Sequence, residues 1–205
     1  MGKRTNDPEG LRRRLLDTAD RLFQAQGYHG TSIHDLIREA GVTGGALHHH
    51  FASKKLLGLA VIRERVAHAV RETWLAPLQQ AESGESAVQM VLAAICRGLD
   101  ERGRVQGCPL NNLALELALA DDDFRAALDA IFTEWREGLT ARLRQDGLRR
   151  MEAEARAGFI IAAYSGAIAM AKTAQSAAPL KNCARMLSAR SMPSAPDSRR
   201  AAAGR

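Results

Sequence analysis

The sequence predicts an all-α protein in which a three-helix N-terminal head precedes a larger helical domain. Aromatic residues make up only 4% of the chain, while alanine and leucine are plentiful, and this composition favours helices over sheets. Apolar residues recur at helical spacing in successive segments, and glycine and proline separate the segments. We expect a head at 1–52, a helical body at 53–190 and a disordered basic tail at 191–205.

The first helix is expected to begin near Pro8 or Glu9 and to end at Gly27. Proline is tolerated in a first turn, and glycine commonly ends a helix. Thr31 or Ser32 can cap a second, short helix that ends at Ala40, because a hydroxyl can accept a hydrogen bond from an unpaired N–H group of the first turn. The head therefore starts with one longer and one short helix.

A turn at Gly41 leads to the third helix, which Thr43 can cap and which reaches His50. Ser53 can cap a fourth, long helix that ends between residues 77 and 84. Further helices are expected with an apolar stripe at 88–99 and over 109–120, 121–146 and 149–174. Another short helix can follow Pro179, and we expect no strand.

The last long helix contains a run of 15 residues without charge, from Ala157 to Ala171. This run is shorter than a bilayer span, so we interpret it as a buried or interface helix. Small residues at Ala155, Gly158, Ala162 and Gly166 permit close helix packing, either inside the subunit or across a dimer. The polar N-terminus predicts no secretory signal, so we expect a cytoplasmic protein without a membrane partner.

Residues Ser32 to Phe51 fit a helix-turn-helix unit. Their apolar side chains can close one small core with the apolar stripe of the first helix, which runs from Leu11 to Phe23. The second helix of such a unit enters the major groove, led by its N-terminal residues. Here that end is Thr43–Ala46, a segment poor in side chains that lets the backbone approach a duplex closely.

The basic charge of the N-terminal segment agrees with an anionic partner. The formal net charge is +6, and residues 1–55 hold nine Lys/Arg against six Asp/Glu. Residues 181–205 hold six against one. Attraction to phosphate supplies much of the affinity of a protein for DNA, so both ends can contribute to it.

The pattern over residues 12–60 resembles the N-terminal signature of the TetR family. The matching segments share order and spacing with that signature. They are Leu22-Phe23, Gly27-Tyr28, Thr31-Ser32-Ile33, Ala40-Gly41-Val42, Gly45-Ala46-Leu47, His49-His50-Phe51 and Ser53-Lys54. The resemblance implies a homodimer that binds a palindromic operator in double-stranded DNA. It further implies that the body binds a ligand and dimerises through the helices at 122–146 and 150–175.

The resemblance also implies DNA contacts for eight residues of the head. Thr43–Ala46 would face bases or the nearby backbone, and Ser32 and Lys54 would contact phosphate. His48 stands where a phosphate-binding tyrosine is usual, and Gly44 where a longer polar residue is usual. The eight predicted DNA-binding residues are Ser32, Thr43, Gly44, Gly45, Ala46, His48, His49 and Lys54. Because Gly44 and His48 have shorter reach, we expect DNA shape and the basic residues Lys3, Arg4, Arg12, Arg13 and Arg14 to compensate.

A second segment, Gly107-Cys108-Pro109-Leu110 followed by Asn112-Leu113-Ala114 and Glu116, resembles one subgroup of this family. Its known members resemble repressors of drug-efflux and aromatic-compound genes. Apolar residues of the body can therefore line an effector pocket, although each one alone also fits a core position. The candidates are Trp74, Cys96, Leu99, Cys108, Leu113, Leu117, Phe132, Trp135 and Met170.

Three features of the sequence could suggest metal binding or a reactive thiol, but the residues around them do not support either. Side chains in the run His48–His50 point about 100° apart on a helix, so they cannot converge on one metal ion. Asp121–Asp123 is expected to cap a helix. Residues 107–110 contain no basic side chain that would lower the pKa of Cys108, so we do not expect a reactive thiol there. The sequence shows no nucleophile–base pair, phosphate loop or metal-ligand set, so we expect no enzyme activity, cofactor or metal.

We therefore expect a TetR-type repressor that a small apolar or aromatic ligand releases from its operator. The alternative is a DNA-binding regulator of the same fold without a small-molecule inducer. A cavity of several hundred Å³ within residues 85–175 favours the first hypothesis, and a solid core favours the second.

Overall fold

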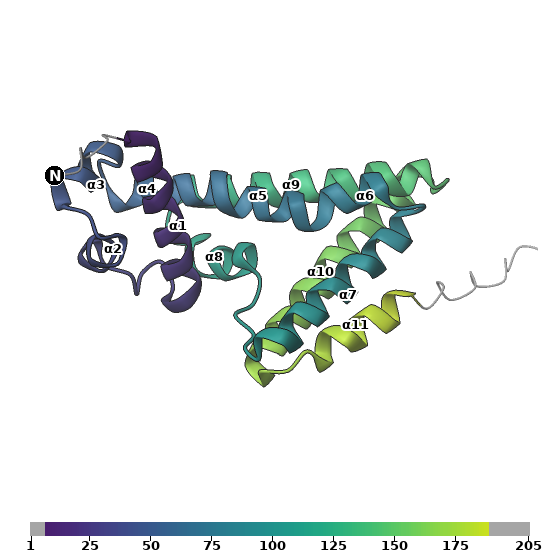
Figure 1. The fold of residues 1–205 in the computed structure, drawn as a ribbon. Helices are drawn as coiled ribbons and strands as arrows, with labels where there is room; N and C mark the ends of the chain where they lie inside the picture. The colour runs from purple at the N-terminus through teal and green to yellow at the C-terminus, as the bar shows by residue number, and fades with distance from the viewer. Residues whose placement is uncertain (1–6, 189–205) are drawn as a thin grey trace, which may run out of the picture.

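The computed structural model describes residues 7–188. Within this range every regular element is helical and no strand is present, which confirms the predicted all-α fold (Figure 1). The predicted tail at 191–205, and Lys3 and Arg4 of the basic arm, lie outside the described residues.

Three helices form the head, at one end of the molecule (Figure 1). They are α1 (Pro8–Gln26), α2 (Ile33–Ala40) and α3 (Gly44–His50). Gly27 and Gly41 follow α1 and α2 with φ of +82° and +62°, a region that glycine adopts without steric cost. Both glycines lie where the sequence places a helix end. The head closes over a core that includes the fully buried Leu36 and Leu47.

One long helical rod connects the head to the body. It consists of α4 (Lys54–Val61), the π-helical turn η1 (Ile62–Val66), α5 (Ala67–Val70), a second π-helical turn η2 (Arg71–Leu75) and α6 (Ala76–Gln80). Every fourth residue from 62 to 78 is buried, namely Ile62, Val66, Val70, Trp74 and Leu78.

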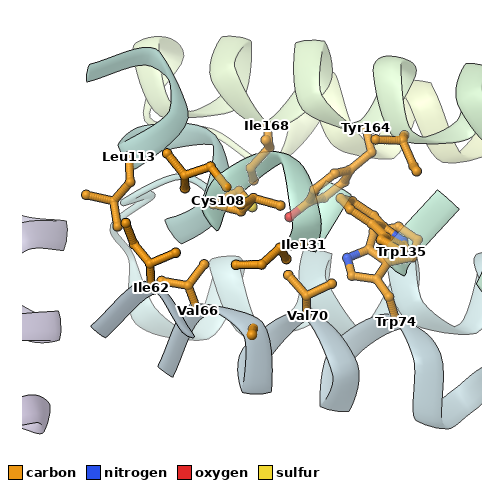
Figure 2. Close-up of a cluster of buried hydrophobic side chains, with 14 of the residues drawn as sticks. Ile62, Val66, Val70, Trp74, Cys108, Leu113, Ile131, Trp135, Tyr164 and Ile168 are labelled. Carbon is orange, nitrogen blue, oxygen red and sulfur yellow. The ribbon is translucent and has the colours of Figure 1, made fainter. Parts of the chain in front are cut away.

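The two π turns explain this spacing. An α-helix has about 3.6 residues per turn, so a stripe of every fourth residue drifts around its axis. A π turn closes its hydrogen bond one residue later than an α turn and therefore holds more residues. Alternation of the two keeps the stripe on one side, and Figure 2 shows Ile62, Val66, Val70 and Trp74 facing the same buried cluster.

Five helices complete the body: α7 (Gly84–Arg102), α8 (Pro109–Leu117), α9 (Asp122–Gln145), α10 (Arg150–Ala174) and α11 (Ala178–Ser188). Helix α9 runs beside the long rod, whereas α7, α10 and α11 lie together as a second group (Figure 1). Trp135 of α9 is fully buried, and its ring lies 4.8 Å from that of Trp74 and 5.8 Å from that of Tyr164. These aromatic contacts join the rod, α9 and α10 (Figure 2).

Helix α10 is long and apolar enough to cross a membrane by length and composition alone. One of its faces packs against α9 and α11, with Ala153, Ala157 and Ala171 fully buried. We therefore interpret α10 as a core helix of the body, in line with the sequence.

Candidate functional site

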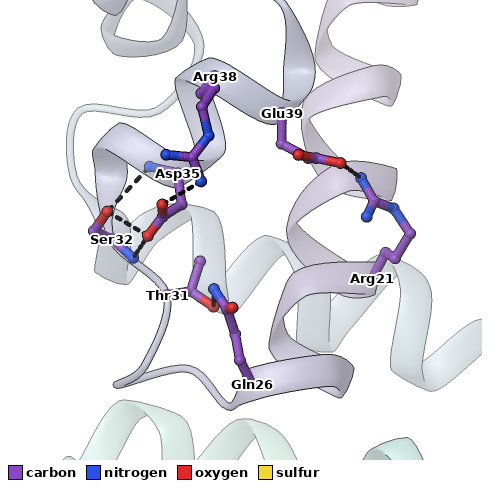
Figure 3. Close-up of polar contacts among 7 residues, drawn as sticks. All are labelled: Arg21, Gln26, Thr31, Ser32, Asp35, Arg38 and Glu39. Atoms are coloured by element: carbon purple, nitrogen blue, oxygen red, sulfur yellow. Dashed lines mark hydrogen bonds and ion pairs between the residues drawn. The ribbon is translucent and has the colours of Figure 1, made fainter.

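The helix-turn-helix unit consists of α2, the turn at Gly41 and α3, supported by α1. A capping box fixes the start of α2: Ser32 Oγ accepts from the N–H of Asp35 at 3.0 Å, and the N–H of Ser32 donates to Asp35 Oδ2 at 3.1 Å (Figure 3). Hydrogen bonds to the Asp35 carboxylate from the Ser32 hydroxyl and from the Ser32 N–H hold the pKa of Asp35 below its usual value. Arg21 of α1 pairs with Glu39 of α2 at 2.9 Å, which ties the unit to its supporting helix (Figure 3).

Helix α3 presents the predicted recognition surface. The Oγ1 atom of Thr43 accepts from the N–H of Ala46 at 3.2 Å and caps the helix, as predicted. Gly45, His48 and His49 are exposed, while Leu47 is fully buried. A Cβ atom on Gly45 would meet no atom of the described residues within 4 Å, so this side of α3 is bare backbone. The arrangement gives a duplex close access to the start of α3.

Ser32 and Lys54, which are expected to contact phosphate, instead bind other residues of the chain in this structure. Ser32 uses both its N–H and its hydroxyl on Asp35 Oδ2, the hydroxyl at 2.6 Å. The ammonium of Lys54 lies 4.3 Å from the ring centre of Tyr28, and burial lowers the pKa of Lys54. A phosphate contact by either residue requires these internal contacts to be exchanged, so their DNA roles remain predictions.

The basic residues of α1 divide into two groups. Arg12 donates to both carboxylate oxygens of Glu64 on the rod, at 2.7 Å from Nη1, and its guanidinium lies 5.4 Å from the Phe51 ring centre. Arg12 thus stabilises the head against the rod. Arg13 and Arg14 are exposed and remain candidates for contact with DNA.

The histidine and aspartate runs have local structural explanations. His49 and His50 stack edge to face, with 5.3 Å between ring centres. Asp121 caps α9, because its carboxylate accepts from the N–H groups of Asp123 and Phe124, as the sequence predicts. In residues 7–188 no group of three His, Cys, Asp or Glu side chains could hold a metal ion.

A carboxylate of α8 binds the head through its backbone. Glu116 Oε2 accepts from the N–H of Tyr28 at 2.9 Å, and Oε1 accepts from the N–H of His29 at 2.6 Å. On the same helix, Asn112 donates to Gln24 of α1 at 3.1 Å. Hydrogen bonds to a charged acceptor are roughly twice as strong as neutral ones. Helix α8 therefore holds the loop that precedes the helix-turn-helix unit.

A second contact between head and body surrounds the start of the rod. Lys55 bridges Asp121 at 2.6 Å and Asp123 at 2.7 Å, which raises the pKa of Lys55 and lowers that of Asp121. Gly58 is buried here, and a Cβ atom on it would lie 2.8 Å from Tyr28 Cε2 and 3.1 Å from Phe124 Cε1. Only glycine permits this close approach without displacement.

A cavity of about 490 Å³ lies beside α8, within the size range typical of small-molecule sites. It is lined from α8 and the turn before it, from Phe132 of α9 and from one face of α10. The lining residues are Gly107, Cys108, Asn111, Asn112, Ala114, Leu115, Phe132, Ser165, Ile168, Ala169, Lys172 and Thr173.

Two of the nine predicted ligand residues, Cys108 and Phe132, line this cavity. Six others are buried core side chains that do not line it: Trp74, Cys96, Leu99, Leu113, Leu117 and Trp135. Met170 is 64% exposed on the outer face of α10. We therefore restrict the candidate ligand site to the cavity.

The Cys108 thiol is buried, and burial raises its pKa. A hydrogen bond from the Tyr164 hydroxyl and others from the backbone act in the opposite direction but are weaker (Figure 2). The thiol therefore stays protonated at neutral pH, which agrees with a packing or pocket role.

The polar lining of the cavity was not among the predicted site residues. Asn111, Asn112 and Lys172 line it, and Glu116 lies one turn beyond Asn112 on α8. The sequence did contain a sign of a polar site, since Asn111-Asn112 and Glu116 interrupt an otherwise apolar helix. Each of them also has a partner 54 to 88 residues away in the chain, so the sequence alone could not assign their roles.

The geometry is that of a helix-turn-helix protein whose N-terminal unit is followed by a larger helical C-terminal part. Residues 15–61 match the model of the TetR family of bacterial regulatory proteins. The chain belongs to the TetR family, which consists of transcription regulators rather than enzymes. Residues 85–186 match the C-terminal domain of LmrA/YxaF-like transcriptional regulators, which agrees with the predicted subgroup resemblance.

Several known proteins are similar over most of their length. The HTH-type transcriptional regulator LmrA of Bacillus subtilis (strain 168) is 28% identical, over 82% of this chain and 90% of that protein. The HTH-type transcriptional repressor DhaR of Mycobacterium sp. (strain GP1) is 28% identical, over 83% and 86%. A solved TetR transcriptional regulator from Chloroflexus aurantiacus J-10-FL is 30% identical with a TM-score of 0.77, over 89% and 94%.

Proposed function

We propose that this chain is a repressor that binds a palindromic operator as a homodimer and leaves it when a small molecule occupies the cavity. The chain acts in the cytoplasm, where bacterial DNA lies. Its head comprises residues 1–52 and its ligand and dimerisation domain residues 53–190. The similarity to DhaR, a repressor by name, supports repression as the direction of control.

The observation that carries this proposal is that α8 both lines the cavity and contacts the head. This helix and the turn before it line the cavity, and Glu116 on the same helix binds the backbone N–H groups of Tyr28 and His29. The lining residues of this segment are Gly107, Cys108, Asn111, Asn112, Ala114 and Leu115. A ligand that binds better to one position of α8 shifts the head with it. The loss of DNA affinity then equals the difference in ligand affinity between the two states.

The outer face of α10 supports a homodimer. Met151, Phe159 and Met170 are 82%, 57% and 64% exposed on it. A Cβ atom on Gly158 or Gly166 would meet no neighbouring atom of residues 7–188 within 4 Å, so these two glycines do not serve packing inside the subunit. An exposed apolar face of this kind is typical of a protein interface.

The exposed residues of α9 and α11 indicate which of these two helices joins α10 in the interface. The exposed side of α9 carries charged residues, including Arg125, Asp129 and Arg136, whereas α11 exposes Met186 at 74%. We therefore propose an interface of α10 with α11, in place of the 122–146 helix expected from the family resemblance. In the DNA-bound dimer the two α3 helices should lie about 34–36 Å apart.

Analytical ultracentrifugation tests the interface. Gly166→Arg places a charge on the exposed face of α10 and should convert a dimer into a monomer without unfolding the subunit. The matched control, Ala126→Arg on the exposed side of α9, should remain dimeric. Dissociation of the Ala126 variant with an intact Gly166 variant would instead assign the interface to α9.

Selection of bound sequences from a random duplex pool tests operator binding. A two-fold symmetric consensus is the expected result, with affinity that falls steeply as salt rises. Lys54→Ala should weaken all duplexes about equally, because a phosphate contact carries no sequence information. A consensus without symmetry would contradict the dimer, and a salt-insensitive affinity would contradict the phosphate contacts.

The regulator without an inducer remains the competing hypothesis. Its expected signature was a solid core between residues 85 and 175, whereas all the residues that line the cavity of about 490 Å³ lie in this region. The cavity volume thus favours the ligand-released repressor.

A further inference from the structure

The polar groups of the cavity are concentrated at two places along α10. Ser165 lies beside Asn111 at one of them, and Lys172 lies beside Asn112 at the other. Ser165 and Lys172 are seven residues apart on one helix, which corresponds to roughly 10 Å along its axis. Ile168 and Ala169 line the space between them. The cavity therefore has two polar ends and an apolar middle.

The Lys172 end is positively charged. Lys172 Nζ donates to Asn112 Oδ1 at 3.1 Å, and the amide of Asn112 is fixed because its Nδ2 donates to Gln24 and to the carbonyl of Gln106. Gly107 permits this arrangement: a Cβ atom on it would lie 2.9 Å from Asn112 Oδ1 and 3.1 Å from Lys172 Cδ.

The carboxylate of Glu116, one turn beyond Asn112 on α8, is bound to the N–H groups of Tyr28 and His29. Lys172 forms no ion pair within the described part of the chain, and no Asp or Glu of residues 7–188 lines the cavity. The ammonium group of Lys172 is exposed and has no carboxylate partner, so it is free to pair with an anionic ligand at this end of the cavity.

The Asn111 end offers a neutral hydrogen-bond donor. Asn111 is 9% exposed, and its Oδ1 accepts from Ser165 Oγ at 3.3 Å. Its Nδ2 has no hydrogen-bond partner among the described residues. Because an unsatisfied buried donor is costly, this N–H group favours a ligand with an acceptor oxygen at that end.

The middle of the cavity suits a flat apolar body. Phe132 of α9, Leu115 of α8 and Ile168 of α10 form its walls. The Phe132 ring is half-buried and offers a face or edge to an aromatic ligand.

We infer that the cavity binds an aromatic carboxylic acid with an oxygen at the opposite end of the molecule. The carboxylate pairs with Lys172, the ring lies against Phe132, and the distal oxygen accepts from Asn111 Nδ2. This inference rests on the proposed function of the cavity as the effector site. It specifies the ligand by charge and length, beyond the apolar or aromatic character that the sequence suggests.

Calorimetric titration of the full-length protein with three matched compounds tests the inference. They are 4-hydroxycinnamate, its neutral amide 4-hydroxycinnamamide and cinnamate, which lacks the distal oxygen. We expect the amide and cinnamate each to bind about tenfold more weakly than 4-hydroxycinnamate, since each loses one polar contact. Equal binding of the acid and the amide, or no binding of the acid, would overturn the inference.

Two lysine variants locate the site. Lys172→Met retains most of the stem but removes the charge, so it should weaken the acid about tenfold and leave the amide unchanged. The control Lys181→Met removes an exposed lysine of α11 that pairs with Asp100 and does not line the cavity, and it should bind like wild type. Unchanged acid affinity in the Lys172 variant would also overturn the inference.

Release from the selected operator, measured separately, distinguishes this inference from the proposed function. Lys172-dependent binding of the acid without any change in DNA affinity would refute the effector role while supporting the ligand assignment. Release by another molecule, independent of Lys172, would support the effector role and refute the ligand assignment.

Discussion

Gly58 provides a quantitative test of the contact between head and body. An added Cβ atom in Gly58→Ala would lie 2.8 Å from Tyr28 Cε2 and 3.1 Å from Phe124 Cε1. Both rings are buried, at 8% and 3% exposure, so they cannot move away freely. Overpacking of this kind costs about 1–3 kcal/mol. Alanine in a helix regains up to about 1 kcal/mol relative to glycine, so we expect a net destabilisation of about 1 kcal/mol.

Thermal unfolding measures this difference. For a chain of this size, 1 kcal/mol corresponds to a Tm change of about 2–4 °C, so Gly58→Ala should lower Tm by that amount. The matched control is Gly45→Ala, where the new Cβ atom meets no described atom within 4 Å. It should gain about 0.4–1 kcal/mol. A Gly58→Ala protein as stable as the Gly45→Ala protein would refute the close packing at Gly58.

Three further predictions concern the head and its contacts. Glu116→Gln leaves one oxygen for the two N–H groups of Tyr28 and His29, so the free energy of unfolding should fall by about 1 kcal/mol in a denaturant titration; no change would show that the contact is not stabilising. The lowered pKa of Asp121 stabilises the fold above its unfolded pKa of about 3.9, and this contribution is lost as pH falls through the lower folded value. Lys55→Met removes the main cause, so the decrease of Tm between about pH 5 and pH 3 should become shallower, and an unchanged slope would argue against the ion pair. Thr43→Ala removes the cap of the seven-residue helix α3, at a cost of about 1 kcal/mol, and should weaken operator binding in a mobility-shift titration, whereas Thr43→Ser should retain it.

The helix-turn-helix unit could be predicted because its signals act over a few residues. Ser32 and Thr43 accept from N–H groups three residues ahead, and Gly41 adopts its positive φ at the turn itself. Such local preferences appear directly in the sequence. The positions of α1 to α3 and the caps of α2 and α3 were therefore predictable.

The cavity and the rod depend on longer distances. Residue type cannot distinguish Phe132 on the cavity wall from Trp135 in the core, because both are aromatic and lie on the same helix. The sequence predicted a long helix after Ser53, but not the π turns that keep its buried stripe on one side. Packing between distant segments decides both features, and one sequence without a structure does not contain that geometry.

The hydrogen bonds between Glu116 and the head bear on how such proteins can acquire new operator sequences. Its two partners are main-chain N–H groups at positions 28 and 29, which every residue except proline supplies. The contact therefore does not depend on which side chains the head carries at positions 28 and 29, apart from excluding proline. A head with a different operator preference can dock on the same carboxylate if its loop follows the same path. Hybrid regulators that join this ligand domain to the head of a relative would then respond to the same small molecule at a new DNA sequence.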